Sequence, residues 1–175
     1  VTTNEGNVTF ASATTLSGAL RTITTGAGAG NIQFSNTLTG TAIGVQALTL
    51  TAGTGNINFN GIVGTVALGA VTINAANNVT MLAAFDAVSL NQAVAGTGTF
   101  QNNGVLTATT GGVTINSALV DINNNIVANG AGQAVLVTGT TDLGGNVTTN
   151  EGNVTFASAT TLSGAARTID TGAVG

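Results

Sequence analysis

Carboxylates are almost the only side chains of this chain that could support acid–base or metal chemistry. General acid–base catalysis needs paired titratable groups, and a Ser or Thr nucleophile needs a base to activate it. The sequence has no His, Cys, Lys or Tyr, and we expect Asp86, Asp121 and Asp142, in the middle of the repeat unit, to be well separated. We therefore predict that the protein is not an enzyme. The six carboxylates are Glu5, Asp86, Asp121, Asp142, Glu151 and Asp170.

The same carboxylates are a poor set of metal ligands. Calcium needs several oxygen ligands close together, and the Asp-containing nonapeptide of calcium-binding β-rolls is absent. Glu5 and Glu151 occupy equivalent places in a repeated segment, which makes solvated corner residues the simpler interpretation. We expect no metal site and no cofactor.

Charge and hydropathy exclude two further classes of partner. The formal net charge is only -4 and the basic residues are two arginines, Arg21 and Arg167, which cannot neutralise a phosphate backbone. Apolar residues are scattered among Gly, Thr and Asn, without the run of roughly 18 that a membrane helix requires. We predict no nucleic-acid partner and no membrane span.

Threonine is abundant in this chain, with 33 residues, and several threonines occur in Thr-x-Thr triplets. Thr-x-Thr triplets resemble the flat threonine arrays of ice-binding solenoids, but their spacing is irregular and Thr is favoured on any solvent-facing strand. Ice binding is a weaker alternative. The triplets include Thr22/Thr24, Thr37/Thr39, Thr49/Thr51 and Thr107/Thr109.

A long exact repeat shows how these residues are organised. The segment VTTNEGNVTFASATTLSGA begins at Val1 and again at Val147, so the period is 146 residues, and 25 of the 29 overlapping residues are identical. Residues 1–146 form one complete unit of a tandem array, and residues 147–175 are the start of the next. The four differences are Leu20/Ala166, Thr24/Asp170, Gly28/Val174 and Ala29/Gly175.

A shorter motif recurs inside the long unit. A Gly or Asn, usually followed by Asn, precedes alternating apolar and polar residues, as in GNVTF at Gly6 and GNINF at Gly55. A second alternating run, such as RTITT from Arg21 or ALTLTA from Ala47, follows in most copies. Alternation is typical of half-buried strands, and Gly and Asn supply corner conformations.

These patterns predict an all-β protein, a parallel β-helix (β-solenoid) with about seven rungs of roughly 15–25 residues per unit. Equivalent side chains should stack from rung to rung, so that Phe156 continues the column begun by Phe10. The predicted first apolar ladder is Phe10, Phe34, Phe59, Met81, Phe100, Ile115, Leu136 and Phe156. The second is Ile23, Leu50, Ile73, Leu90, Ile122 and Ile169. Stacked amides should form a third, of Asn7, Asn31, Asn56, Asn78 and Asn153.

With GNVTF, GNINFNG and ALTLTAGTGNINF, the chain resembles the repeat regions of large secreted bacterial surface proteins of the filamentous-haemagglutinin type. The resemblance implies right-handed parallel β-helices, export to the cell surface, and a role in adhesion, aggregation or matrix formation. The expected function is a structural extracellular fibre, sheath or stalk whose partners are other copies of itself. A stalk that displays a separate ligand-binding tip, with glycan or cell-surface contact, remains the alternative, and functional amyloid is a weaker one.

Overall fold

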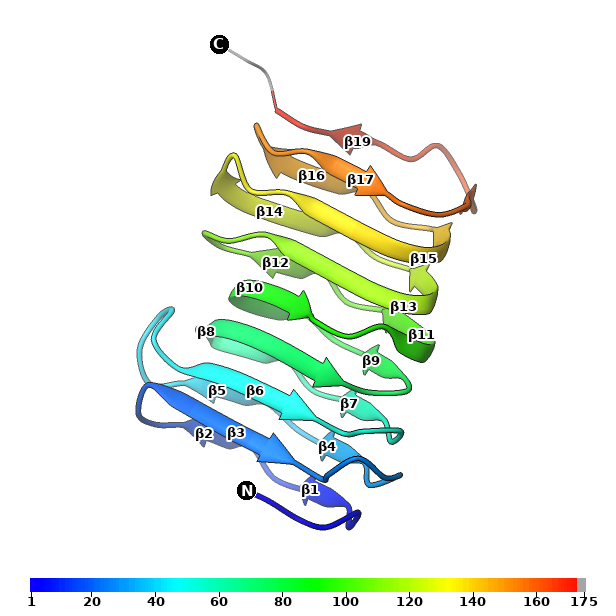
Figure 1. Ribbon diagram of the computed structural model, residues 1–175. Coiled ribbons are helices and arrows are strands. Elements are labelled where there is room, and N and C mark those ends of the chain that lie inside the picture. The colour runs from blue at the N-terminus through cyan, green and yellow to red at the C-terminus, as the bar shows by residue number, and fades with distance from the viewer. Residues whose placement is uncertain (173–175) are drawn as a thin grey trace.

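A computed structural model describes residues 1–172 and contains strands but no helix in that range. All 19 strands belong to one sheet in which every strand pair is parallel, and the sheet coils into about eight turns. Figure 1 shows the turns stacked from the N-terminus at one end to the C-terminal region at the other. The fold is a β-solenoid, as predicted.

Each turn has three sides, and each side is a ladder of parallel strands. The first side contains β1 (Val8–Phe10), β4 (Ile32–Phe34), β7 (Ile57–Phe59), β9 (Val79–Met81), the ends of β11 (Gly96–Asn102), β13 (Val113–Ile122) and β15 (Val135–Leu143), and β18 (Thr160–Leu162). The second contains β2 (Thr14–Leu16), β5 (Leu38–Gly40), the starts of β8 (Val63–Ala75) and β10 (Phe85–Gln92), β12 (Leu106–Ala108), β14 (Ile126–Ala131), β16 (Val147–Asn150) and β19 (Ile169–Asp170). The third contains β3 (Leu20–Thr24), β6 (Ala47–Thr51), the ends of β8 and β10, the starts of β13 and β15, and β17 (Val154–Phe156).

Alternation decides which face of each strand points inward. In β4, Ile32 and Phe34 are buried while Gln33 between them faces outward, and β7 repeats this pattern. Glycine serves the corners in two ways. Gly64 has a φ of +83°, and a Cβ on Gly55 would collide with the carbonyl of Gly30 in the turn below. Both the backbone conformation and the turn below therefore constrain which residue a corner can hold.

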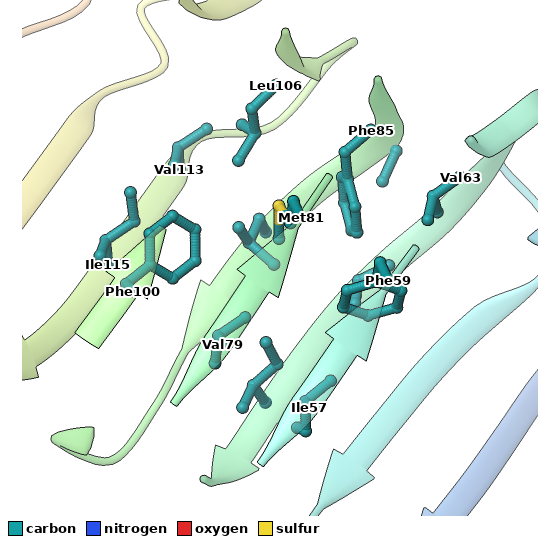
Figure 2. Packing of buried hydrophobic residues seen from close by; sticks show 14 of the residues in the cluster. Ile57, Phe59, Val63, Val79, Met81, Phe85, Phe100, Leu106, Val113 and Ile115 are labelled. Carbon is teal, nitrogen blue, oxygen red and sulfur yellow. The ribbon is translucent and has the colours of Figure 1, made fainter. Parts of the chain in front are cut away.

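Aromatic stacking organises the core of the lower turns. The rings of Phe10 and Phe34 stack with centroids 4.9 Å apart, and those of Phe34 and Phe59 with centroids 5.4 Å apart. Phe85 of the second side meets Phe59 edge-on at 80°. Figure 2 shows Phe59, Met81 and Phe85 gathered in the interior between the sides.

The predicted first ladder follows one column only as far as the fourth turn. Phe10, Phe34, Phe59 and Met81 align in register on the first side. The column then continues through Asn102, Ile122, Leu143 and Leu162.

The remaining members of that predicted ladder lie elsewhere. Phe100 is on the first side but two residues out of register, because it pairs with Val79. Ile115 and Phe156 are on the third side, and Leu136 points outward there, 38% exposed. The expectation that Phe156 continues the column of Phe10 is wrong.

The second predicted ladder diverges in the same way. Ile23, Leu50 and Ile73 align on the third side. Leu90 is on that side two residues out of register, opposite Val71; Ile122 is on the first side, and Ile169 on the second. All three sides carry the same alternation and similar Gly/Asn corners, so the sequence pattern marks a side without showing which one.

The long repeat therefore spans a whole number of sides but not of turns. On the first side β18 lies seven turns above β1, and β17, which carries the second VTF, comes one side before β18. One unit thus occupies six turns and two sides, close to the seven predicted. Val1 and Thr3 lie beside Thr24 of the third side, whereas Val147 is on the second side, so Val147 does not stand above Val1.

Turn length changes along the axis. One turn takes 25 residues from Ile32 to Ile57 and 19 from Thr141 to Thr160. Positions that differ between the two copies lie where no core contact constrains them: Leu20, Ala166 and Asp170 are exposed and Thr24 is half-buried. The other two differences involve residues 174 and 175, which lie outside the described residues.

Truncating the aromatic stack should destabilise the solenoid. Phe59→Ala removes a ring that is 1% exposed and contacts aromatic neighbours on two sides, so we expect a loss of about 3–5 kcal/mol in unfolding free energy. Ile43→Ala, at a position 78% exposed, is the matched apolar truncation and should change stability by no more than about 0.5 kcal/mol. Urea unfolding followed by circular dichroism measures both, and equal losses would contradict this core.

Candidate functional site

Stacked asparagines close the corner that precedes the first side. The Nδ2 groups of Asn31, Asn56 and Asn78 donate to the Oδ1 of the asparagine one turn below, at 3.2, 3.1 and 2.8 Å. Each lower Oδ1 also accepts the backbone N–H of the asparagine above. The series begins at Asn7 and ends where the backbone N–H of Thr99 donates to Asn78 Oδ1 at 2.7 Å. These amides are occupied in holding turns together.

Asn153 does not belong to this ladder. It precedes β17 on the third side, level with Ala134, for the same reason that Phe156 leaves the column of Phe10. A corner that sequence reasoning missed uses the same bond. The backbone N–H groups of Asn146 and Thr168 donate to the Oδ1 atoms of Asn125 and Asn146, at 3.0 and 2.9 Å.

One asparagine points into the core. Asn102 is fully buried in the column of Phe59 and Met81, and its Nδ2 donates to the carbonyl of Asn124 at 2.9 Å and to that of Gly104 at 3.3 Å. These bonds satisfy the amide nitrogen, whereas Asn102 Oδ1 is buried without a hydrogen-bond partner among the described residues. The sequence shows that Asn102 lies on the same face of its strand as Phe100, two residues earlier. That this face points inward follows only from the register of strand pairing.

The structure brings together two carboxylates that are distant in sequence. Asp121 and Asp142 are paired residues of β13 and β15, one turn apart on the outer surface of the first side. Gln101, one turn below, donates from Nε2 to Asp121 Oδ2 at 2.8 Å. The description of these aspartates as well separated is therefore wrong in space. The missed signal is their spacing of 21 residues, which is the local length of a turn.

The aspartate pair lines a shallow depression of about 480 Å³. Leu119 and the threonines Thr99, Thr140 and Thr161 contribute to its lining, and neither arginine does. The described residues contain no group of three or more His, Cys, Asp or Glu side chains able to hold a metal ion. The depression thus combines two carboxylates and several hydroxyls with a lining surface that is largely apolar.

The other carboxylates are dispersed. Glu5 and Glu151 occupy equivalent corners with φ of 64° and 62°, and the backbone N–H of each donates to a threonine carbonyl at 2.8 Å. Asp170 accepts the N–H of Gly172 at 2.9 Å in a local turn. Asp86 faces outward on the second side beside Thr107.

The threonine triplets form an array only in part. Thr22/Thr24 and Thr49/Thr51 lie one above the other on the third side, where Thr72 continues one column and Asn74 donates to Thr51 Oγ1 at 3.4 Å. Thr39 and Thr107 lie on the second side, whereas Thr37 and Thr109 fall outside the strands. Among these triplets, the aligned threonines are therefore confined to the first three turns of the third side.

The class of protein that these observations define is a parallel β-solenoid with outward Thr, Asn and Asp ladders. Comparisons with protein-family models, curated proteins and solved structures find no match. Residues 1–172 include no helix long and apolar enough to cross a membrane.

Breaking the asparagine ladder should lower the unfolding free energy by more than the loss of buried side-chain area alone would. Asn56→Ala deprives the backbone N–H of Asn78 of its acceptor, so we expect a loss of about 1–3 kcal/mol in unfolding free energy. Asn58→Ala is the control, because within the described residues the Asn58 side chain makes no hydrogen bond and faces outward. Chemical denaturation compares the two, and equal effects would refute a structural role for the ladder.

The stacked aspartates should repel each other measurably. Asp142→Asn removes one of two like charges on paired positions, so we expect a gain of the order of a few tenths of a kcal/mol at neutral pH and low salt. The gain should shrink in 1 M salt, where the screening length falls to about 3 Å. Asp86→Asn, which faces Thr107, controls for the substitution itself. Melting curves at both salt concentrations provide the measurement, and a salt-independent gain would argue against repulsion.

Proposed function

We propose that this protein is a structural protein of an extracellular fibre, sheath or stalk at the cell surface, built from tandem β-solenoid units that associate with one another. The observation that supports this most directly is the junction between units. Strands β16, β17 and β18 of the second copy pair in parallel with β14 and β15 of the first, in the same way that turns pair within a unit. An array of any length would then be one continuous rod.

Burial of equivalent residues supports the same continuation. Leu16 and Ile23 of the first copy are 7% and 3% exposed, because the next turn covers them. Their counterparts Leu162 and Ile169 are 64% and 50% exposed at the top of the stack. A further turn of the array would bury this apolar surface, and burial of a Leu or Ile stabilises by roughly 1.5–3 kcal/mol.

The glycine near the start of each copy also supports continuous stacking of units. A Cβ on Gly152 would collide with the carbonyl of Gln133 in the turn below. The equivalent Gly6 meets no atom closer than 3.7 Å. The need for glycine at this position therefore arises from stacking on a preceding turn.

Lateral association has a candidate surface of its own. We define the apolar ridge as Ile43, Val45 and Val88, at a corner between the second and third sides. Ile43 and Val45 are 78% and 51% exposed, and a Cβ on the intervening Gly44 would lie 3.1 Å from Val88. Gln46 Oε1 accepts the N–H groups of Thr41 and Ala42, both at 3.0 Å, so the loop that carries the ridge is fixed. Only 5% of residues are charged, which leaves little electrostatic repulsion between rods.

The placement at the cell surface rests on the resemblance to filamentous-haemagglutinin-type repeats and on the rod shape that tandem units would build. Such a rod also suits the stalk of an adhesin with a separate tip. The two roles differ in lateral behaviour: a fibre protein bundles through its sides, whereas a stalk stands alone.

Purified arrays of several units should form bundled fibres with a meridional reflection at about 4.8 Å. Replacing the ridge residues in Ile43→Ser/Val45→Ser should reduce bundling several-fold in sedimentation and electron microscopy while the reflection persists. Ile43→Val/Val45→Ile keeps the apolar surface and should still bundle. Disordered or helix-rich material would overturn the proposal, and single rods from the unaltered sequence would favour the adhesin stalk.

A further inference from the structure

Identical sequence lies on different sides of the solenoid. The first copy of VTF forms β1 on the first side, and the second forms β17 on the third. The following TTL segments form β2 on the second side and β18 on the first. From one copy to the next, the same residues are displaced by one side against the direction in which the chain winds.

Local conformation is nevertheless preserved. Gly18 and Gly164 have φ of 78° and 75°, and Gly26 and Gly172 have φ of 86° and 81°. Thr3 and Thr149 each donate from Oγ1 to the carbonyl of the glycine three residues later. The segment therefore keeps these local conformations on either side, so a rotation about the axis and a translation along it relate the two copies.

Three applications of that operation return the chain to its starting side. Each unit advances twenty sides, which is one side short of seven turns, so three units complete twenty whole turns. The net rotation from one unit to the next therefore averages one third of a turn. At the spacing of paired strands, of about 4.8 Å, one unit rises about 32 Å and three units about 96 Å.

We propose that an array of these units is a filament with three-fold screw symmetry, which presents every surface feature of the unit in three directions in succession. The apolar ridge would recur about every 32 Å, turned by about 120° each time. A filament could then contact neighbouring copies of itself on three sides, which gives a trigonal bundle instead of a flat sheet. The lateral contact rests on the proposed function, whereas the screw symmetry depends only on the chain being a tandem array.

The assignment of segments to sides can be tested by disulfide formation in the present chain, because the chain contains no cysteine of its own. Gln101 and Asp121 are paired, outward-facing residues of the first side, so Gln101→Cys/Asp121→Cys should form a disulfide under mild oxidation. Thr99→Cys/Thr114→Cys is the matched pair that would form one if Phe100 and Ile115 shared a column, and it should stay reduced. Mass spectrometry after alkylation distinguishes them, and the opposite result would overturn the proposal.

The symmetry itself is measured on an array of at least three units by electron cryomicroscopy of single rods. We expect a rotation near one third of a turn and a rise of about 32 Å per unit. No rotation with a rise of about 34 Å, the value for seven whole turns, would overturn the screw. Single rods that show the rotation without bundling would leave the screw intact and refute lateral association, so the two failures are distinguishable.

Discussion

Backbone hydrogen bonding between successive turns is the constraint on which the rest of this structure depends. Parallel strands on all three sides must remain one strand spacing apart, so the paired residues of each ladder are held against their counterparts one turn below. An inward Phe then lies on another apolar side chain, and an outward polar residue on another polar one. Stacking of Phe10, Phe34 and Phe59 and bonding between Asn31 and Asn56 are two results of the same register.

This constraint restricts the choice of residue more strictly at the corners than on the sides. Side chains on a strand have space inside or outside the coil, but at a corner the backbones of two turns approach closely. Gly55 is required because the carbonyl of Gly30 occupies the place of a Cβ, and Asn56 follows because its amide bonds to both the side chain above and the one below. The Gly-Asn motif therefore closes a stacked corner, which explains why it recurs from turn to turn.

The sequence predicts the class of fold and much of the lower half of the core, because alternation and the Gly-Asn corners are local signals. Phe10 to Met81 and Ile23 to Ile73 were placed in their columns by motif alone. Above them, turns shorten from 25 to 19 residues, and the motif GGVTI opens a third side instead of a first. Local patterns do not indicate which side a strand belongs to. The sides of Ile115, Ile122 and Ile169 could therefore be assigned only from the pairing of distant strands. The aspartate pair was missed for the same reason, since contact across a turn depends on turn length.

Because the local sequence pattern does not specify which side a segment forms, a unit of six turns and two sides can be tolerated. A copied segment must preserve the inward and outward alternation and must close each corner on the turn beneath it. Both conditions hold when the unit contains a whole number of sides, because each side is followed by a corner encoded in its own sequence. The copies beginning at Val1 and Val147 meet both conditions on different sides and keep the same φ at Glu5 and Glu151. A repeat of this kind needs no whole number of turns, and the remainder of two sides sets the symmetry of whatever the array builds.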